Sequence, residues 1–216
     1  MLNLTDKVCL VTGATRGIGK SIAQKLGAQG AIVIGTATSD AGAESISKAL
    51  SDAGIKGEGM TLNVSDGDSV DAVLNAITEK FGAIAVLVNN AGIQYVSKLE
   101  EFPADKWQLI TNVLLVGPAM MTKAVLPLMR ANNFGRIINI GSLHGLVASP
   151  YKSAYVAAKH GIIGFSKVIA LETGDQDITI NTICPAYVKT PFTWLMSENE
   201  ESVVFIISAD ELAGLS

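Results

Sequence analysis

Short runs of β-branched and other apolar residues alternate along this chain with longer segments of mixed polarity. A brief, nearly continuous apolar run indicates a strand that is buried on both faces of a sheet. The longer segments have the length and polarity of helices that cover such a sheet. Strands and helices in alternation require right-handed crossovers between parallel strands. The sequence therefore predicts an α/β fold with a doubly wound parallel sheet and helices on both faces.

The apolar runs place the expected strands at residues 8–12, 31–36, 85–89, 136–140 and 178–184, with a weaker candidate near 59–64. The expected helices lie at 17–29, 40–53, 66–81, 104–130 and 153–173. Ligands of such folds bind beyond the carboxyl ends of the strands, where the strand order reverses. We therefore expect the functional residues in the segments that follow the strands.

The composition is that of one globular domain. The 216 residues are 49% hydrophobic and 17% charged, and 20 acidic residues against 16 basic ones give a net charge of -4. Without a basic cluster, nucleic-acid binding is not expected. Cys9 and Cys184 lie far apart and outside any CxxC or Cys/His group, so neither a disulfide framework nor a metal site is indicated.

No membrane segment is expected, because no run reaches the about 18 consecutive apolar residues of a membrane span. The N-terminal segment carries charge before its short apolar stretch, which is not the pattern of a secretion signal. The sequence also has no linker, repeat or low-complexity tract. We expect a soluble cytoplasmic protein.

The first expected strand runs directly into a glycine-rich loop, TGATRGIG at 12–19, and then into a helix. Glycines let the backbone approach a pyrophosphate closely, and a helix N-terminus offers free N–H groups and a positive dipole end. Tight turns also use glycine for steric reasons alone. The position of this loop between the first strand and the first helix favours a phosphate-binding loop.

The loop has the spacing GxxxGxG, and the expected strand at 85–89 runs into the sequence NNAG. Both features resemble the short-chain dehydrogenase/reductase family, and Asn63 with Val64 falls where that family contacts adenine. The resemblance implies a Rossmann-like domain that binds a nicotinamide dinucleotide. The residues it implies for cofactor binding are Gly13, Thr15, Arg16, Gly17, Ile18, Gly19, Thr38, Asn63, Val64, Asn90, Ala91, Gly92, Tyr155, Lys159, Pro185, Val188 and Thr190.

The choice between NAD and NADP depends on the charge at the end of the second strand. An acidic residue there would bond a free ribose hydroxyl and repel a 2′-phosphate. The stretch that ends in Thr38 has no carboxylate before Asp40, and Arg16 in the glycine loop is able to pair with a phosphate. This balance favours NADP(H) and leaves NAD(H) open, and the alternative role for Arg16 is a solvated surface charge.

Tyr155 and Lys159 are four residues apart, on one face of an expected helix. A tyrosine with a pKa near 10 is a poor base at neutral pH, but a neighbouring cation favours the phenolate. Such a pair is more often an aromatic core contact beside a surface amine. Ser142 follows the strand at 136–140, where a hydroxyl is able to hold a reacting oxygen, and YxxxK with an upstream serine is the family's active-site pattern.

By this resemblance Ser142 polarises the substrate carbonyl and Tyr155 is the acid or base, while Lys159 also holds the nicotinamide ribose. Asn112 matches the family's fourth catalytic residue, which anchors a water in a proton relay. The alternative for Asn112 is a buried helix asparagine that bridges backbone carbonyls.

Two subfamilies are visible in the chain. The first half resembles the 3-oxoacyl-[acyl-carrier-protein] reductases, and the second half resembles the D-3-hydroxybutyrate dehydrogenases, as a natural or an engineered mosaic would. The second resemblance implies a small carboxylate held by charged Lys152 and by neutral Gln94 and His144, beside Ser142 and Tyr155. Lys152 as a solvated loop charge and His144 as a satisfied loop histidine stay open alternatives.

We therefore expect an NAD(P)-dependent oxidoreductase that interconverts 3-hydroxyacyl and 3-oxoacyl groups, with D-3-hydroxybutyrate and acetoacetate as the favoured pair. One alternative is 3-oxoacyl-[acyl-carrier-protein] reduction in fatty-acid synthesis, and another is a non-catalytic dinucleotide-binding protein. The family resemblance implies a homo-oligomer, in particular a tetramer.

The resemblance covers residues 1–193, and beyond them the chain is short for the family. We expect residues 1–216 to form a single domain without part of the substrate lid and without the C-terminal strand, through a deletion, a truncation or missing segments. The stretch 202–208 resembles the family's penultimate helix. Ala186 follows Pro185 where the family has glycine next to the nicotinamide.

Overall fold

The structure, a computed structural model, describes residues 3–186, 188 and 204–207, the last four by their backbone alone. Its centre is a seven-stranded sheet in the order β3-β2-β1-β4-β5-β6-β7. The strands are β1 (Val8–Val11), β2 (Ile32–Ala37), β3 (Gly57–Thr61), β4 (Ile84–Asn89), β5 (Gly135–Ile140), β6 (Ile178–Pro185) and β7 (Val204–Ile207). The first six pair in parallel, and their order reverses between β1 and β4.

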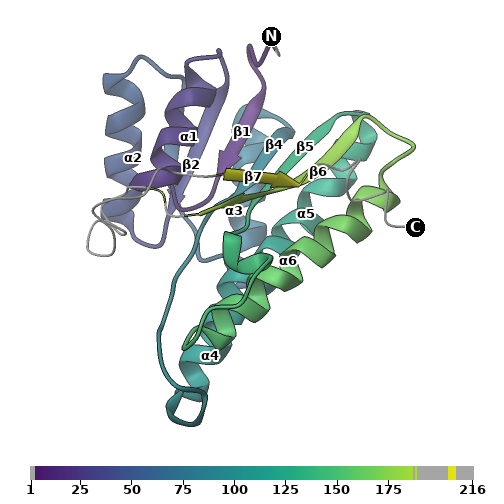
Figure 1. The fold of residues 1–216 in the computed structure, drawn as a ribbon. Helices are drawn as coiled ribbons and strands as arrows, with labels where there is room; N and C mark the ends of the chain where they lie inside the picture. The colour runs from purple at the N-terminus through teal and green to yellow at the C-terminus, as the bar shows by residue number, and fades with distance from the viewer. Residues whose placement is uncertain (1–2, 187, 189–203, 208–216) are drawn as a thin grey trace.

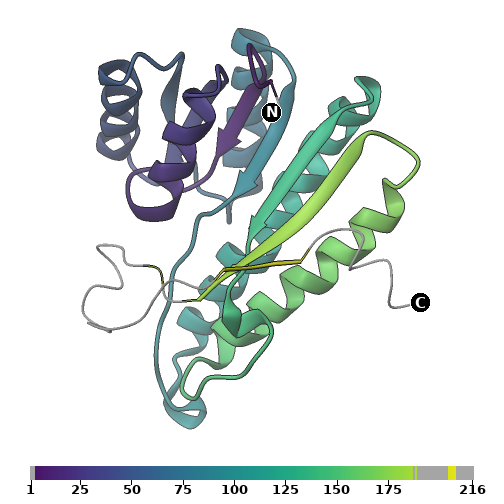
Figure 2. The same ribbon diagram turned by 45° about the horizontal axis from the view of Figure 1, so that its top comes forward.

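Helices cover both faces of the sheet (Figures 1 and 2). They are α1 (Gly17–Gly27), α2 (Asp40–Asp52), α3 (Gly67–Phe81), α4 (Ala104–Thr111), α5 (Gly117–Ala131) and α6 (Ser153–Glu172), with short helical turns η1 (Leu99–Glu101), η2 (Asn112–Val116) and η3 (Leu143–Gly145). Apolar residues of α1 and α2 form one core with the sheet, and those of α3, α5 and α6 form the other. The predicted doubly wound α/β fold is confirmed.

Polar side chains fix two helix starts close to the carboxyl ends of the strands. The hydroxyl of Ser39 accepts a hydrogen bond from the N–H of Gly42 at the start of α2. The carboxylate of Asp66 accepts from the N–H groups of Asp68 and Ser69 at the start of α3. Such caps satisfy backbone donors that have no partner inside the helix, so they define where the chain turns from strand to helix.

The single helix expected over 104–130 is interrupted by the wider π-turn η2. Here the N–H of Gly117 donates to the carbonyl of Asn112, five residues earlier. Pro118 follows directly, and proline has no N–H to continue the regular ladder. The π-turn therefore has a local cause that the apolar pattern did not reveal.

The helix expected at 202–208 is wrong for the four described residues of that stretch. Residues Val204–Ile207 form β7, which pairs antiparallel with β6. The sequence Val-Phe-Ile-Ile is β-branched and aromatic, which favours a strand, and β6 presents the edge of the parallel sheet on which β7 pairs. The sheet is therefore mixed at this edge rather than parallel throughout.

Two helical stretches, Ala104–Ala131 and Ser153–Glu172, are long and apolar enough by length and composition to cross a membrane. They correspond to α4 through α5 and to α6. Residues of α5 and α6 pack on the sheet, and Ile110 of α4 packs with Ala154 and Ala158 of α6. Core helices pass the same test of length and hydropathy, so this observation is weak support for a span.

The two faces of β5 differ in burial, and this difference predicts unequal effects of matched mutations. Ile137 is fully buried under the helices, whereas its neighbour Ile138 is only partly buried on the opposite face. We expect Ile137→Ala to lower the free energy of unfolding by about 3 kcal/mol and Ile138→Ala by about 1 kcal/mol. Urea denaturation followed by circular dichroism measures both. Equal losses would contradict the burial described for β5.

Candidate active site

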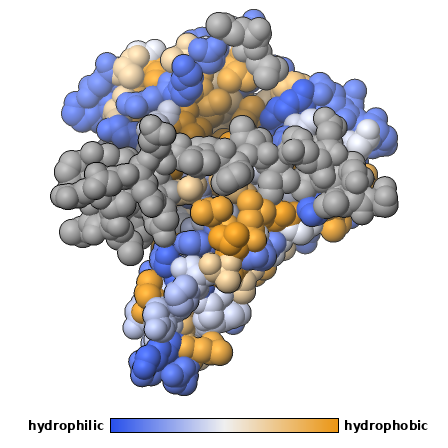
Figure 3. All heavy atoms as spheres, viewed as in Figure 1, coloured by the Kyte–Doolittle hydropathy of each residue, from blue (hydrophilic) through white to orange (hydrophobic). Residues whose placement is uncertain are grey.

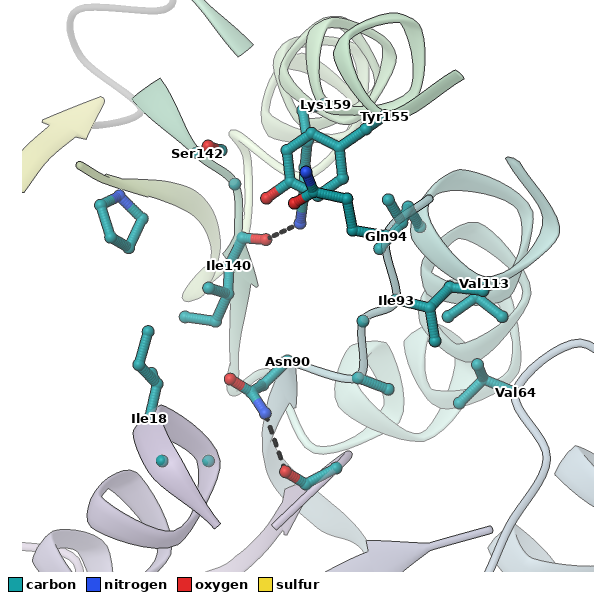
Figure 4. Close-up of a pocket in the computed structure, with 18 of the residues that line it drawn as sticks. Ile18, Val64, Asn90, Ile93, Gln94, Val113, Ile140, Ser142, Tyr155 and Lys159 are labelled. Atoms are coloured by element: carbon teal, nitrogen blue, oxygen red, sulfur yellow. Dashed lines mark hydrogen bonds between the residues drawn. The ribbon is translucent and has the colours of Figure 1, made fainter. Parts of the chain in front are cut away.

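A cavity of about 610 Å³ opens where the strand order reverses, at the carboxyl ends of β1, β4 and β5 (Figure 4). It contains, from the sequence predictions, Gly13, Thr15, Arg16, Gly17, Ile18, Gly19, Thr38, Asn63, Val64, Asn90, Ala91, Gly92, Gln94, Ser142, His144, Lys152, Tyr155, Lys159, Pro185 and Val188. Segments far apart in the sequence thus meet in one place. Two predicted residues are not in this set: Asn112 does not line the cavity, and Thr190 lies outside the described residues.

The glycine-rich loop between β1 and α1 is held against the end of β4. Asn90 donates from Nδ2 to the carbonyls of Thr12 and Gly13, at 2.9 and 3.0 Å. In return, the hydroxyl of Thr12 accepts from the backbone N–H groups of Asn90 and Ala91, both at 2.9 Å. These bonds join the two strands at the reversal point. They give the loop a fixed position over the cavity.

The loop fits a pyrophosphate. Gly13 and Gly17 have positive φ angles of 68° and 55°, which favour glycine. A Cβ on Gly19 would lie 2.3 Å from the carbonyl oxygen of Gly13, so the start of α1 comes as close as it does only because it has no side chain there. No side chain caps the N-terminus of α1, and its free N–H groups are able to bind an anion.

The part of the cavity at the end of β2 has no negative charge. Among the described residues that line the cavity there is no Asp or Glu, while Arg16 and Thr38 are present. The carboxylate of Asp40 instead accepts a hydrogen bond from the Thr61 hydroxyl at 2.6 Å. A phosphate at this end would therefore face a cation and hydroxyls rather than a carboxylate.

Ser142, Tyr155 and Lys159 come together from two elements. Ser142 follows the end of β5, and the other two residues lie one turn apart on α6, so they face the cavity together (Figure 4). The Nζ of Lys159 donates to the carbonyl of Ile140 at 2.5 Å and lies 5.7 Å from the centre of the Tyr155 ring. A bond to the Ser142 hydroxyl favours the ionised form of Tyr155.

Burial sets the charge states of this group. It raises the pKa of Tyr155, and the hydrogen bond with Ser142 opposes that rise. Burial also lowers the pKa of Lys159 to about 8. The expectation that Lys159 brings the Tyr155 pKa below its usual value is therefore not met, because removal from water outweighs other contributions. Tyr155 is protonated at neutral pH and is able to act as an acid.

A second polar group lies next to Tyr155 in the cavity. The Nζ of Lys152 is 3.3 Å from the Nε2 of His144, and the His144 ring packs edge-on to Tyr155 with 6.3 Å between centres. Burial and the Lys152 charge lower the pKa of His144. Lys152 is only 9% exposed, and among the described residues it has no carboxylate within 4.0 Å. A buried cation without a counter-ion is a good binding point for an anion.

The contacts of Asn112 differ from those that its predicted role requires. Its Oδ1 accepts a hydrogen bond from Gln108 at 2.8 Å, and its carbonyl accepts from Gly117 in the π-turn. The side chain therefore neither reaches the cavity nor bridges buried backbone carbonyls.

Sequence analysis missed the carbonyl of Ile140, which holds Lys159. A backbone acceptor leaves no mark in the residue pattern. It also missed the apolar wall made by Ile93, Val113 and Leu114, although Ile93 follows directly on the NNAG motif that the analysis used.

Comparisons with known proteins agree with this site. The family model described as short chain dehydrogenase matches residues 7–201. The 3-oxoacyl-[acyl-carrier-protein] reductase FabG of Haemophilus influenzae is 43% identical over 92% of this chain and 81% of its own length. The FabG reductase of Escherichia coli is 41% identical over 99% of this chain and 86% of its own length. The D-beta-hydroxybutyrate dehydrogenase of Cupriavidus necator is 45% identical over 87% of this chain and 73% of its own length.

These matches confirm both resemblances read from the sequence motifs. Together with a cavity that joins a glycine-rich loop to a serine, a tyrosine and a lysine, they establish that the chain belongs to the short-chain dehydrogenase family, as an NAD(P)-dependent oxidoreductase that acts on CH–OH groups.

Proposed function

We propose that the protein interconverts D-3-hydroxybutyrate and acetoacetate. The observation that carries this proposal is the buried Lys152, which lines the same cavity as Ser142 and Tyr155. Among the described residues, its ammonium group has no carboxylate partner. A free carboxylate is the substrate group that such a cation selects. The name of the Cupriavidus necator relative supports the same substrate.

Tyr155 transfers the proton at the reacting oxygen. In reduction its phenol donates to the carbonyl oxygen of acetoacetate, and in oxidation the phenolate takes the proton back. A dinucleotide held by the glycine-rich loop and Lys159 would supply or accept the hydride at the carbon of that carbonyl. Ser142 polarises the carbonyl, since its hydroxyl is able to donate to the same oxygen. The hydrogen bond between Ser142 and Tyr155 supports a shared approach of both side chains to one atom.

Lys159 supplies positive charge beside the phenol. Its Nζ is fixed by the carbonyl of Ile140, which leaves further N–H donors for the ribose of the dinucleotide. An ammonium this close stabilises the phenolate that forms when Tyr155 gives up its proton. This role belongs to the moment of transfer, and it is compatible with the raised pKa of the resting tyrosine.

The carboxylate of the substrate lies, in this proposal, against Lys152, His144 and Gln94. His144 is neutral because its pKa is lowered, so its ring accepts a hydrogen from Lys152 and orients the ammonium. The other hydrogens of Lys152 and the amide of Gln94 remain for the two carboxylate oxygens. Gln94 extends toward Tyr155 in the cavity (Figure 4), which supports its place between the two ends of a short substrate.

We propose NADP(H) as the preferred dinucleotide. The absence of Asp and Glu from the described cavity lining, and the presence of Arg16, support a site for the 2′-phosphate. The hydrogen bond that Asp40 receives from Thr61 supports the same choice.

The second candidate is reduction of a 3-oxoacyl group carried on an acyl carrier protein. The names of several relatives, including the FabG proteins of Haemophilus influenzae and Escherichia coli, support it. A thioester has no carboxylate, so this candidate leaves the buried charge of Lys152 unexplained. The two candidates share the proton transfer at Tyr155 and differ only in the group that would bind at Lys152.

We also propose a single cytoplasmic domain that assembles as a homo-oligomer, in particular a tetramer. Exposed apolar residues gather on the three helices α4, α5 and α6, namely Leu109, Met120, Leu128, Val168 and Leu171. Figure 3 shows hydrophobic side chains among polar ones on the lower part of the molecule, where α4 and α6 lie. An apolar helical face of this kind is suited to contact with a second copy of the chain.

Replacement of Tyr155 tests the proton transfer. Tyr155→Phe removes only the hydroxyl, so we expect kcat to fall by about a thousandfold, while the dinucleotide Kd stays within about twofold. Absorbance at 340 nm measures turnover, and quenching of intrinsic fluorescence measures binding. Turnover close to that of the wild type would refute the assigned role.

Replacement of Lys152 tests the substrate. The wild type should reduce acetoacetate in preference to an acetoacetyl thioester, and Lys152→Ala should raise the KM for acetoacetate by about tenfold or more through loss of a charge-assisted hydrogen bond. The KM for the thioester should change by less than about twofold. Lys98→Ala, which removes an exposed lysine, is the matched control. A wild-type preference for the thioester would replace the first candidate with the second.

Burial of Lys159 predicts a pH-dependent cost in stability. Its pKa falls from the usual lysine value of 10.5 to about 8 in the folded protein, so below pH 8 the folded state holds a desolvated cation. Lys159→Met should therefore raise the free energy of unfolding by about 3 kcal/mol below that pH. The advantage should vanish as the pH rises from 8 toward 10.5. Urea denaturation at a series of pH values measures it, and a constant difference would contradict the lowered pKa.

A further inference from the structure

Four polar side chains form a continuous chain of hydrogen bonds in the core beneath the active site. Asn89 donates from Nδ2 to Oδ1 of Asn139 at 2.8 Å, and Asn139 donates from Nδ2 to the Ser166 hydroxyl at 2.9 Å. The hydroxyls of Ser166 and Thr182 are 2.8 Å apart, and Ser166 also bonds the carbonyl of Ile162 at 2.8 Å. Their exposed fractions are 5%, 1%, 0% and 0% in the order Asn89, Asn139, Ser166, Thr182.

The four residues come from the four elements that carry the site. Asn89 ends β4 and directly precedes Asn90, which holds the glycine-rich loop in place. Asn139 of β5 and Thr182 of β6 stand three residues before Ser142 and Pro185, respectively.

Ser166 connects the network to helix α6. It follows Lys159 by seven residues, which is close to two helical turns, so both side chains project from the same face of α6. That face packs on the sheet, as the complete burial of Ser166 and the near-complete burial of Lys159 show. A bond at Ser166 therefore acts on the rotation and the axial position of the helix that carries Tyr155.

Apolar packing alone would not fix these positions. The surrounding core is made of aliphatic residues such as Ile137 and Ile180, and contacts between aliphatic side chains are non-directional. A hydrogen bond needs a distance and an angle. A buried polar group also costs free energy when its partner moves away. The network therefore penalises a slide of α6 over the sheet that apolar contacts would tolerate.

We propose that Asn89, Asn139, Ser166 and Thr182 are positioning residues, whose hydrogen bonds hold α6 in register with β4, β5 and β6 so that Tyr155 meets Ser142. The inference rests on the proposed proton transfer at Tyr155. None of the four residues lines the cavity. Their effect reaches the substrate through the placement of α6.

The experiment compares two isosteric changes. Thr182→Val removes a hydroxyl that belongs to the network. Thr122→Val removes the hydroxyl of an equally buried threonine on α5, whose oxygen has no hydrogen-bond partner among the described residues. Both variants exchange a hydroxyl for a methyl group in the same core layer. Thr182→Ser restores the hydroxyl, and Ser166→Ala breaks the network at its centre.

We expect Thr182→Val and Ser166→Ala to lower kcat by about tenfold, since a small displacement of a reacting group is costly. The substrate KM and the dinucleotide Kd should stay within about twofold. Thr122→Val should retain the wild-type kcat, and Thr182→Ser should recover most of it. The idea is overturned if Thr182→Val and Thr122→Val have the same kcat, or if the loss in Thr182→Val is confined to KM.

A titration of Tyr155 without substrate separates this inference from the proposed function. Absorbance at 295 nm, with the signal of Tyr155→Phe subtracted, reports ionisation of this one tyrosine. The bond with Ser142 lowers the Tyr155 pKa, so its loss in Thr182→Val should move the titration to higher pH. The control Thr122→Val should titrate as the wild type does. An unchanged titration in Thr182→Val would overturn the positioning role even if the substrate assignment is correct, and a shifted one supports it even if the substrate is another.

Discussion

The hydrogen bonds between Thr12 and Asn90 join β1 to β4, the two strands at which the sheet reverses its order. Two crossovers leave in opposite directions from this point, so the chain that follows β1 and the chain that follows β4 separate and leave a cavity between them. The glycine loop is pressed against β4 by these bonds. Because the loop is fixed there, the N-terminus of α1 points into the cavity. A site for a pyrophosphate is thus a consequence of the topology, and the glycines are the residues that let the backbone come close enough.

The buried positive charges in the cavity lower the free energy of unfolding, and packing elsewhere in the molecule offsets this loss. Lys159 and Lys152 are both less than 10% exposed, and neither has an ion-pair partner among the described residues. A core optimised for stability alone would contain apolar residues at both positions. Burial of these cations keeps their hydrogen-bond donors free for groups that a ligand brings. Two large apolar cores, one on each face of the sheet, stabilise the fold and compensate for the buried charges.

The periodicity of the sequence predicted the strands and helices well, because each buried strand is a short apolar run and each helix has a mixed face. It failed at 112–116, where the structure depends on a proline that follows a turn. The family resemblance, rather than periodicity, gave the wrong helix at 204–207, where an open sheet edge decides the structure. Of the residues that the motifs predicted, all but Asn112 and Thr190 line the cavity, since most of them follow the ends of strands. What the motifs could not supply was the orientation of side chains. Asn112 has the expected residue type at the expected place, yet its amide bonds Gln108. Likewise, Lys159 and Tyr155 were paired correctly, but the pKa of the tyrosine depends on burial, which a sequence does not state.

The choice between a free acid and a thioester as substrate depends on the buried charge of Lys152. In the proposed mechanism, proton transfer at Tyr155 needs Ser142 and Lys159, and nothing in that chemistry depends on whether the acyl group ends in a carboxylate or continues into a thioester. Relatives that carry either name are 43% and 45% identical to this chain over the aligned residues, as expected when the reaction centre is common. Discrimination between the two substrates then belongs to residues beyond the reaction centre. Lys152 is a cation that lines the cavity outside the Ser142, Tyr155 and Lys159 group, and it contacts His144. Since a buried cation without an anion is unfavourable, a ligand that brings an anion would gain the most from this cavity, which is the physical ground for proposing a small free acid.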